Sequence, residues 1–199
     1  MKSIRAELKT IANWIKPNSR VLDLGCGKGE LLSYLQESQN VTGYGVEIEQ
    51  DNIVASIDNN INVIQADIEQ GLIGFEDNSF DYVIMTQTLQ ALRNTDVILE
   101  EMLRVGREGI VTFPNFGHWR SRLNILFGHM PITKALPNTW YNTPNIHLCT
   151  LKDFEDLCKE KNFKILQRSI VDRQHRNNAF NNLFPNLLGE IALYRIQKL

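Results

Sequence analysis

The chain has few cysteines, no long apolar run and no excess of positive charge. Its three cysteines are an odd number without paired metal-ligand spacing, which favours reduced thiols and a cytoplasmic location over a disulfide framework. No apolar run reaches membrane-spanning length, and charged residues interrupt residues 1–14, unlike a signal peptide. A net charge of −2 gives no general attraction to nucleic acid. We therefore expect no nucleic-acid, membrane or metal partner.

Length and patterning favour one domain over residues 1–199. The chain is 43% hydrophobic, enough for one core, and it has no repeats or linker-like stretches. Apolar runs alternate with helical periodicity, which predicts a doubly wound, mostly parallel sheet in an α/β fold. The predicted strands cover residues 21–24, 41–48, 61–65, 80–85 and 110–113, and the predicted helices cover residues 4–15, 30–36, 50–57 and 95–105.

Three glycines, Gly25, Gly27 and Gly29, follow the first strand and open the next helix. Because glycine has no Cβ, the backbone N–H groups of such a turn can approach a ligand. A dinucleotide fingerprint needs its third glycine one position later, where Glu30 would meet the pyrophosphate. With Asp23 at the strand end, the loop instead favours a ligand that carries an ammonium group, such as S-adenosylmethionine (SAM). The alternative is a tight connection that binds nothing.

Two further acids follow the next two strands. Glu47 comes 20 positions after Gly27, the separation of the acid that binds ribose hydroxyls in dinucleotide-binding sheets. We include the neighbouring Ile48 in the predicted cofactor site. At the same edge of the sheet, Asp67 is predicted to accept a hydrogen bond from an adenine amino group, and Ile68 to flank the ring. The alternative for both acids is a solvated loop position.

These motifs resemble those of the class I SAM-dependent methyltransferases. The residues from Asp23 to Gly29, then Glu47, Asp67 and the strand at 80–85 agree in order and spacing over roughly the first 115 residues. The resemblance implies a seven-stranded, mostly parallel sheet that ends in an antiparallel hairpin. It also implies SAM or S-adenosylhomocysteine as the ligand.

Other segments extend a closer resemblance over nearly the whole chain. Residues 11–17, 88–90, 113–120 and 140–147 are similar to the MetW family of methionine-biosynthesis proteins, although Lys28 stands where an acid is expected in many relatives. Members of that family are associated with homoserine O-acyltransferase. The resemblance therefore implies a SAM-binding accessory or regulatory partner of that enzyme. The alternatives are a SAM-dependent methyltransferase with a small-molecule acceptor, and an interaction module that has lost its ligand.

No motif identifies a catalytic base. Methyl transfer requires in-line positioning of the acceptor, with or without a base, so this absence decides little. Residues 85–88 lack the Asn/Asp-Pro-Pro-aromatic turn of exocyclic-amine methyltransferases, which argues against bases in DNA as acceptors. His118, His147 and Tyr141 are the candidates for acid–base work, with structural or solvated roles as the alternative. We interpret Cys26, inside the glycine turn, as a packing residue of the cofactor loop rather than a nucleophile.

Regular periodicity stops after the fifth predicted strand. Residues 114–149 are predicted to form an irregular lid over the carboxyl ends of the strands. Trp140, Tyr141 and His147 are expected to face the pocket, or the aromatic rings to anchor the loop to the core. One apolar helical stripe lies within this lid: Trp119, Leu123, Leu126 and Phe127.

Regular structure resumes at Thr150, which with Asp153 predicts a helix that starts in a capping box. Residues 163–171 and 190–197 are predicted to be the two strands of the antiparallel hairpin. Between them, residues 172–182 are predicted to form an exposed loop, either solvated or in contact with a partner.

Overall fold

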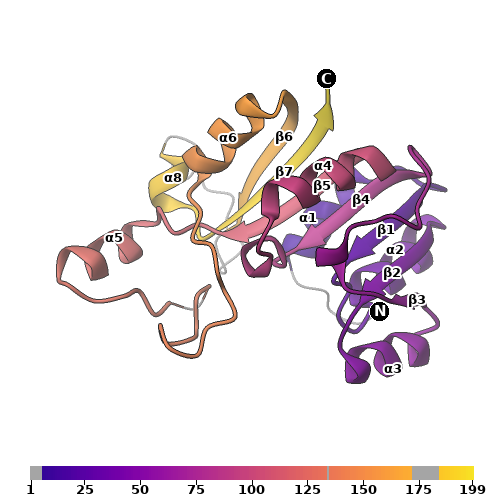
Figure 1. The fold of residues 1–199 in the computed structure, drawn as a ribbon, viewed down its shortest axis with the longest axis horizontal. Helices are drawn as coiled ribbons and strands as arrows, with labels where there is room; N and C mark the ends of the chain where they lie inside the picture. The colour runs from indigo at the N-terminus through magenta and orange to yellow at the C-terminus, as the bar shows by residue number, and fades with distance from the viewer. Residues whose placement is uncertain (1–5, 134, 172–183) are drawn as a thin grey trace.

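The computed structural model describes residues 6–133, 135–171 and 184–199. Within these ranges the strands form one sheet in the order β3-β2-β1-β4-β5-β7-β6 (Figure 1). The strands are β1 Arg20–Leu24, β2 Thr42–Glu47, β3 Asn62–Gln65, β4 Phe80–Thr86, β5 Gly106–Pro114, β6 Phe163–Val171 and β7 Ile191–Lys198. The five neighbouring strands β3, β2, β1, β4 and β5 are parallel, and β7 pairs antiparallel with both β5 and β6. The predicted fold class is confirmed.

The helices cover both faces of the sheet. They are α1 Ala6–Trp14, α2 Glu30–Gln39, α3 Gln50–Asp58, α4 Thr95–Val105, α5 Trp119–Leu126, α6 Leu151–Glu160 and α8 Pro185–Leu188, with 3-10 turns η1 Ile68–Gln70 and η2 Leu89–Ala91. In the described part of the chain, no helix is both long enough and apolar enough to cross a bilayer.

Most predicted elements are found, with differences at their ends. Helix α4 has the predicted bounds, and the predicted capping box of Thr150 and Asp153 is confirmed at the start of α6. Helix α2 runs three residues past its predicted end, to Gln39. The short α8, η1 and η2 were not predicted, since a single turn leaves too little periodicity to detect. Residues 4 and 5 and the predicted loop at 172–182 lie outside the described residues.

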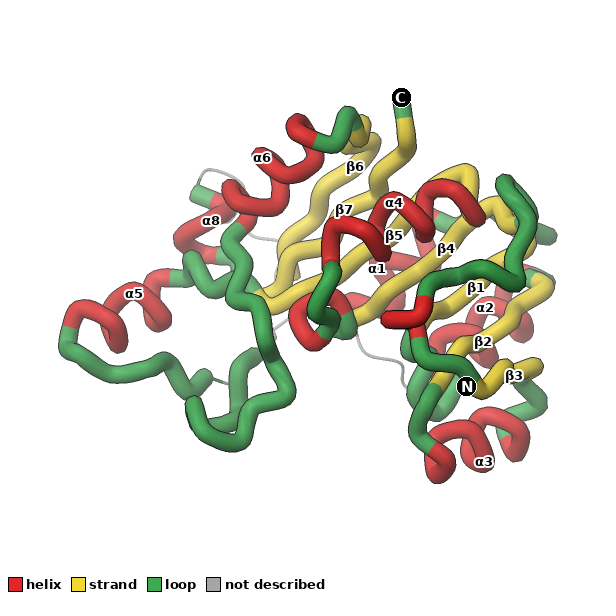
Figure 2. Tube along the Cα trace, viewed as in Figure 1, coloured by secondary structure: helices red, strands yellow, loops and turns green. Residues whose placement is uncertain are grey.

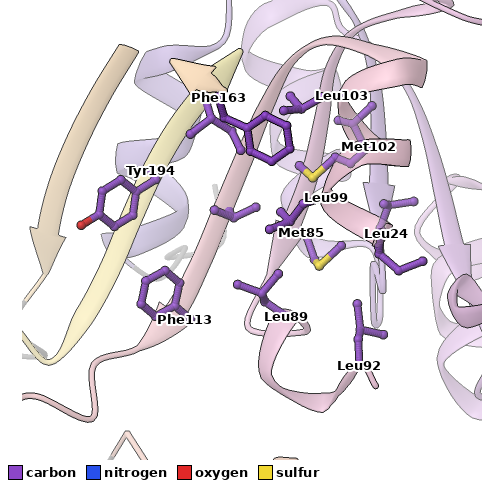
Figure 3. Close-up of a cluster of buried hydrophobic side chains, with 14 of the residues drawn as sticks. Leu24, Met85, Leu89, Leu92, Leu99, Met102, Leu103, Phe113, Phe163 and Tyr194 are labelled. Carbon is purple, nitrogen blue, oxygen red and sulfur yellow. The ribbon is translucent and has the colours of Figure 1, made fainter. Parts of the chain in front are cut away.

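The central strands are buried on both faces, which explains their apolar sequences. Along β4, Val83 and Met85 belong to one core cluster, while Tyr82 and Ile84 belong to the other. This alternation follows from the two-residue period of a strand. Figure 3 shows the first cluster, in which Met85 lies beside Leu99 of α4. The sheet is thus the middle layer of the fold, with one apolar core cluster on each of its faces.

An aromatic trio joins α6 to the antiparallel half of the sheet. Phe154 lies with its ring centroid 5.0 Å from that of Phe113 on β5 and 4.7 Å from that of Tyr194 on β7. The Tyr194 hydroxyl donates to Glu155 Oε1 at 2.8 Å, so its polar end is satisfied. All three rings are almost wholly buried. The trio therefore fixes the angle at which α6 lies on the sheet.

The segment after β5 differs from the predicted lid. Helix α5 and the loop that follows it extend beyond the sheet (Figure 2). The predicted stripe forms on α5, but its four side chains are exposed. Trp140 and Tyr141 are also exposed and pack against each other, with centroids 5.6 Å apart. For these two rings, neither the pocket-facing nor the core-anchoring arrangement is found.

The aromatic trio generates the first prediction. Phe154→Ala should lower the free energy of unfolding by about 3–5 kcal/mol, because it leaves a cavity between α6 and two strands. Phe127→Ala removes the same ring from a position that is 74% exposed and should change stability by less than about 0.5 kcal/mol. Urea unfolding followed by circular dichroism measures both. Equal losses for the two variants would contradict the packing described here.

Candidate functional site

The candidate site lies where the strand order of the sheet reverses. Strand β1 has β2 on one side and β4 on the other, and the chain continues outward from these two strands toward opposite edges. In open α/β sheets, ligands bind outside the carboxyl ends of the strands at such a switch point. Asp23 lies near the end of β1, level with Gly45 of β2 and Ile84 of β4. The predicted glycine loop leaves the sheet at this point.

Hydrogen bonds hold the loop against the end of β2. The N–H groups of Gly25 and Cys26 both donate to the carbonyl of Val46, at 2.8 and 3.1 Å. Gly25 has φ 73°, and a Cβ there would lie 2.7 Å from Thr88 Oγ1, so only glycine allows this close approach to the exit of β4. Gly27 has φ 55°, and a Cβ there would meet nothing within 4 Å. The backbone at Gly27 therefore borders open space.

Glu47 is held beside this loop by three backbone donors. Its Oε2 accepts from Gly27 N at 2.8 Å, and its Oε1 accepts from Ile48 N at 2.8 Å and Glu49 N at 3.0 Å. The side chain is 6% exposed. A carboxylate oxygen can accept more than one hydrogen bond, so Oε2 keeps room for a further donor. Backbone donors thus fix the predicted acid in place, and its Oε2 accepts only one of the three bonds.

Asp23 is the most unusual group of the site. Its side chain is 1% exposed, and its Oδ1 has no hydrogen-bond partner among the described residues. Burial, followed by the negative charge of Glu47, raises the pKa of Asp23 to about 7. A ligand with an ammonium group would supply both a donor and an opposite charge, and would lower that pKa. The site therefore suits a cationic ligand.

Cys26 behaves as a packing residue. Its side chain is buried and lies 3.9 Å from Ser56 Oγ, which in turn donates to the carbonyl of Gly27. Burial, followed by the charge of Asp23, raises the pKa of Cys26 to about 12. The thiol therefore stays protonated at neutral pH, and a protonated thiol is a poor nucleophile.

A hollow of about 300 Å³ lies in front of Asp23, at the lower end of the roughly 300–1,000 Å³ typical of small-molecule pockets. Its lining includes four of the predicted residues: Asp23, Gly25, Cys26 and Gly27. It also includes residues that were not among the predicted cofactor residues: Glu7, Leu8, Lys28, Glu30, Leu31, Asn52, Thr86 and Gln87.

Gln87 is the most informative of these additional residues. It directly follows β4 and has φ 53°, a conformation that is uncommon for a residue other than glycine. Its N–H donates to both the carbonyl and the hydroxyl of Thr112 on β5, at 3.0 Å each. Such conformations persist where the surrounding structure enforces them, often at functional sites. The exit of β4 was visible in the sequence, but this backbone conformation was not.

The other predicted cofactor residues do not line this hollow. Gly29 precedes the first residue of α2, and Asp67 caps η1, with its Oδ1 accepting from Glu69 N at 2.9 Å. Ile68 is 8% exposed and packs into the core, whereas Ile48 is 54% exposed beside Glu47. Of the two isoleucines, only Ile48 offers an exposed apolar surface.

The three candidate acid–base residues lie away from the hollow beside Asp23. His118 is buried and caps α5, its Nδ1 accepting from Arg120 N at 3.3 Å. His147 lines a separate hollow of about 290 Å³ beside Phe113, with its Nε2 3.1 Å from the carbonyl of Arg93. Tyr141 is exposed. Among the described residues, no group of His, Cys, Asp and Glu is arranged to hold a metal ion.

Solved structures share this fold. A SAM-dependent methyltransferase from Mesorhizobium loti is similar with a TM-score of 0.71 and 14% identity, over 97% of this chain and 98% of that one. The [4+2]-cyclase SpnF is similar with a TM-score of 0.69 and 15% identity, over 98% of this chain and 81% of that one. At these identities the likeness concerns the fold alone, and one fold can host different chemistries.

Sequence comparison is more specific. The family described as "Methionine biosynthesis protein MetW" matches residues 5–196. A protein from Rhodopirellula baltica named "Bifunctional methionine biosynthesis protein MetXA/MetW" is 36% identical over 203 aligned positions, which cover 96% of this chain. The chain spans about a third (32%) of that relative's length. The chain therefore belongs to the MetW family of methionine biosynthesis proteins.

Proposed function

We propose that this protein binds SAM in the cytoplasm and acts as an accessory or regulatory partner of homoserine O-acyltransferase. The observation that carries the proposal is the buried Asp23 side chain, whose Oδ1 has no partner in the described structure and which lines a hollow together with Gly25 and Gly27 of the glycine loop. A carboxylate so placed favours a ligand that brings a positive charge. SAM has an ammonium group, ribose hydroxyls and an adenine ring, and the site has a candidate residue for each.

The residues around the loop divide the recognition of SAM among them. Asp23 would accept from the ammonium group, and the free position on Glu47 Oε2 would accept from a ribose hydroxyl. Asp67 would accept from the adenine amino group, and Ile48 would contact the ring through its exposed side chain. Bound SAM would supply a sulfonium methyl group. Because SAM is made from methionine, it is also a reasonable feedback signal for methionine supply.

The partner is supported by the fused relative. In the protein from Rhodopirellula baltica, a MetXA part and a MetW part share one chain. We take the MetXA part to be the homoserine O-acyltransferase that the family resemblance implies. Two activities joined in one chain in one organism are reasonable candidates for association as separate chains in another.

A second candidate is a SAM-dependent methyltransferase that acts on a small molecule. It is favoured by the fold, which is shared with methyltransferases such as the one from Mesorhizobium loti. If the reaction used a base, His118, His147 and Tyr141 would be the candidates, although none of them lines the hollow beside Asp23. We rank the accessory role first because membership of the MetW family favours it.

Binding of SAM can be tested at Glu47. Glu47→Gln should weaken SAM binding at least tenfold, because it removes the charge and one acceptor while keeping the side-chain size. Glu160→Gln makes the same chemical change at an exposed position on α6 and should leave the affinity unaltered. Titration calorimetry gives the affinities, and thermal melting shows whether each variant is folded. Equal affinities for wild type and Glu47→Gln would contradict the proposed ribose contact.

The pKa of Asp23 predicts a pH dependence. Since the pKa is about 7 in the free protein, SAM affinity should rise on the order of tenfold between pH 5.5 and 7.5. Stability of the free protein should change in the opposite direction. The folded-state pKa lies above the unfolded value, so this contribution to stability is present at low pH and is lost as the pH rises through 7.

Asp23→Asn should flatten both pH profiles, since the amide does not titrate. Calorimetry and urea unfolding at each pH measure the two effects. A wild-type affinity that does not change with pH would argue against an ionic contact at Asp23.

The two candidate functions differ in what they do to the acyltransferase. As an accessory protein, the chain should co-elute with purified homoserine O-acyltransferase of the same organism, and SAM should change the activity of the mixture. As a methyltransferase, it should transfer label from methyl-labelled SAM to a fraction of a small-molecule extract. A protein that neither associates with the acyltransferase nor alters its activity would contradict the first proposal.

A further inference from the structure

Exposed apolar side chains gather on one projecting part of the molecule. This arm, residues 119–133 and 135–148, comprises α5 and the described residues that follow it, and it extends past the sheet (Figures 1 and 2). Eleven of the twenty large hydrophobic side chains exposed in the described ranges belong to it. Leu126, Phe127, Trp140 and Tyr141 are each more than 70% exposed. So dense a group of exposed apolar residues marks an interaction surface.

The arm also contains a hollow that an apolar partner could fill. A cavity of about 790 Å³ lies between α5 and a wall that includes Ile132, Thr133 and Pro137. Trp119, Leu123 and Phe127 line it from the helix, and Ile132 and Pro137 line it from the opposite side. Three of the four residues of the predicted stripe, all but Leu126, thus line this cavity, and all four are exposed instead of packed into the core.

Contacts at the base of the arm give it a defined shape. The carbonyl of Gln90 accepts from Ile146 N at 2.8 Å and from His147 N at 3.0 Å, and Phe116 N donates to Cys149 O at 2.9 Å. Within the arm, Leu136 is 7% exposed. A surface that is already ordered loses less conformational entropy on binding, so less of the contact energy is spent on ordering.

The charge of the arm indicates the chemistry of its partner. No Asp or Glu occurs between Glu108 and Asp153, although the whole chain has a net charge of −2. Arg120 lies at the edge of the cavity, with its guanidinium carbon 5.2 Å from the centre of the Trp119 ring. A matching surface would therefore have apolar side chains at its centre and carboxylates near Arg120.

We propose that the arm is the docking surface for homoserine O-acyltransferase, a proposal that rests on the partnership proposed above. The fused relative aligns over 96% of this chain and carries the MetXA part in the same polypeptide, so it supports this occupant over an unrelated protein. A second copy bound arm to arm through a two-fold axis would bring two acid-free, cationic surfaces together, which is unfavourable. The acyltransferase has no such restriction.

The test measures binding of purified acyltransferase to the full chain. Leu126→Glu and Phe127→Glu should each weaken binding at least tenfold, because each puts a charge into an apolar contact. Arg120→Glu should weaken binding and reduce its dependence on salt, because it removes an attraction between opposite charges. The matched controls are Ile73→Glu, at a position 88% exposed, and Lys164→Glu, on β6, and both should bind like the wild type.

The outcomes separate the two proposals. If the wild type does not bind the acyltransferase, the partnership fails, and the docking surface fails with it. If the wild type binds and all three arm variants bind equally well while melting at the wild-type temperature, only the docking surface is wrong. Dissociation of a self-associated wild type by Leu126→Glu would identify a second copy as the occupant. Arm-dependent binding to vesicles of anionic phospholipid would identify a membrane. Either result would overturn the assignment to the acyltransferase.

Discussion

The structure is organised around a carboxylate that is buried before any ligand arrives. Asp23 lies on a central strand, where both neighbouring strands exclude water, and one of its oxygens has no partner in the described structure. Burial of such a group is unfavourable for folding unless it is protonated or neutralised. The apolar clusters on both faces of the sheet, which include Val83 and Ile84, offset this cost. The packing of the core thus allows an acid to stay buried at the position where we propose that a ligand binds.

The parts of the fold that could be predicted are those set by local pattern. Apolar runs predicted the central strands because these are buried on both faces, and the Thr150–Asp153 pair predicted the start of α6 because capping depends on neighbouring residues. Helix α2 runs past its prediction because its last turn, ending at Gln39, is polar and shows no apolar period. Hydrophobic periodicity marks where a helix is buried, and a helix can continue beyond that point.

The site was only partly predictable, for reasons of geometry. Motif spacing brought Asp23, Gly27 and Glu47 together correctly in space, since the ends of adjacent parallel strands meet at one edge of the sheet. Spacing does not report backbone conformation, so Gln87 escaped notice. Nor does it tell which side of a loop a residue occupies, and Ile68 turned out to pack into the core. Sequence likewise does not show whether an amphipathic helix has a partner within its own chain.

Gln90 links the hollow to the arm. The side-chain Nε2 of Gln90 donates to the main-chain carbonyl of Gln87, a residue that lines the hollow, at 2.7 Å. The main-chain carbonyl of Gln90 accepts hydrogen bonds from the N–H groups of Ile146 and His147 at the base of the arm. A shift of the β4 exit on ligand binding would thus act directly on a residue that holds the arm. If a ligand at Asp23 altered the affinity of a partner for the arm, the partner would have to alter ligand affinity by the same factor. If both proposals hold, Gln90 is a residue through which the proposed ligand site and the proposed docking surface are in contact.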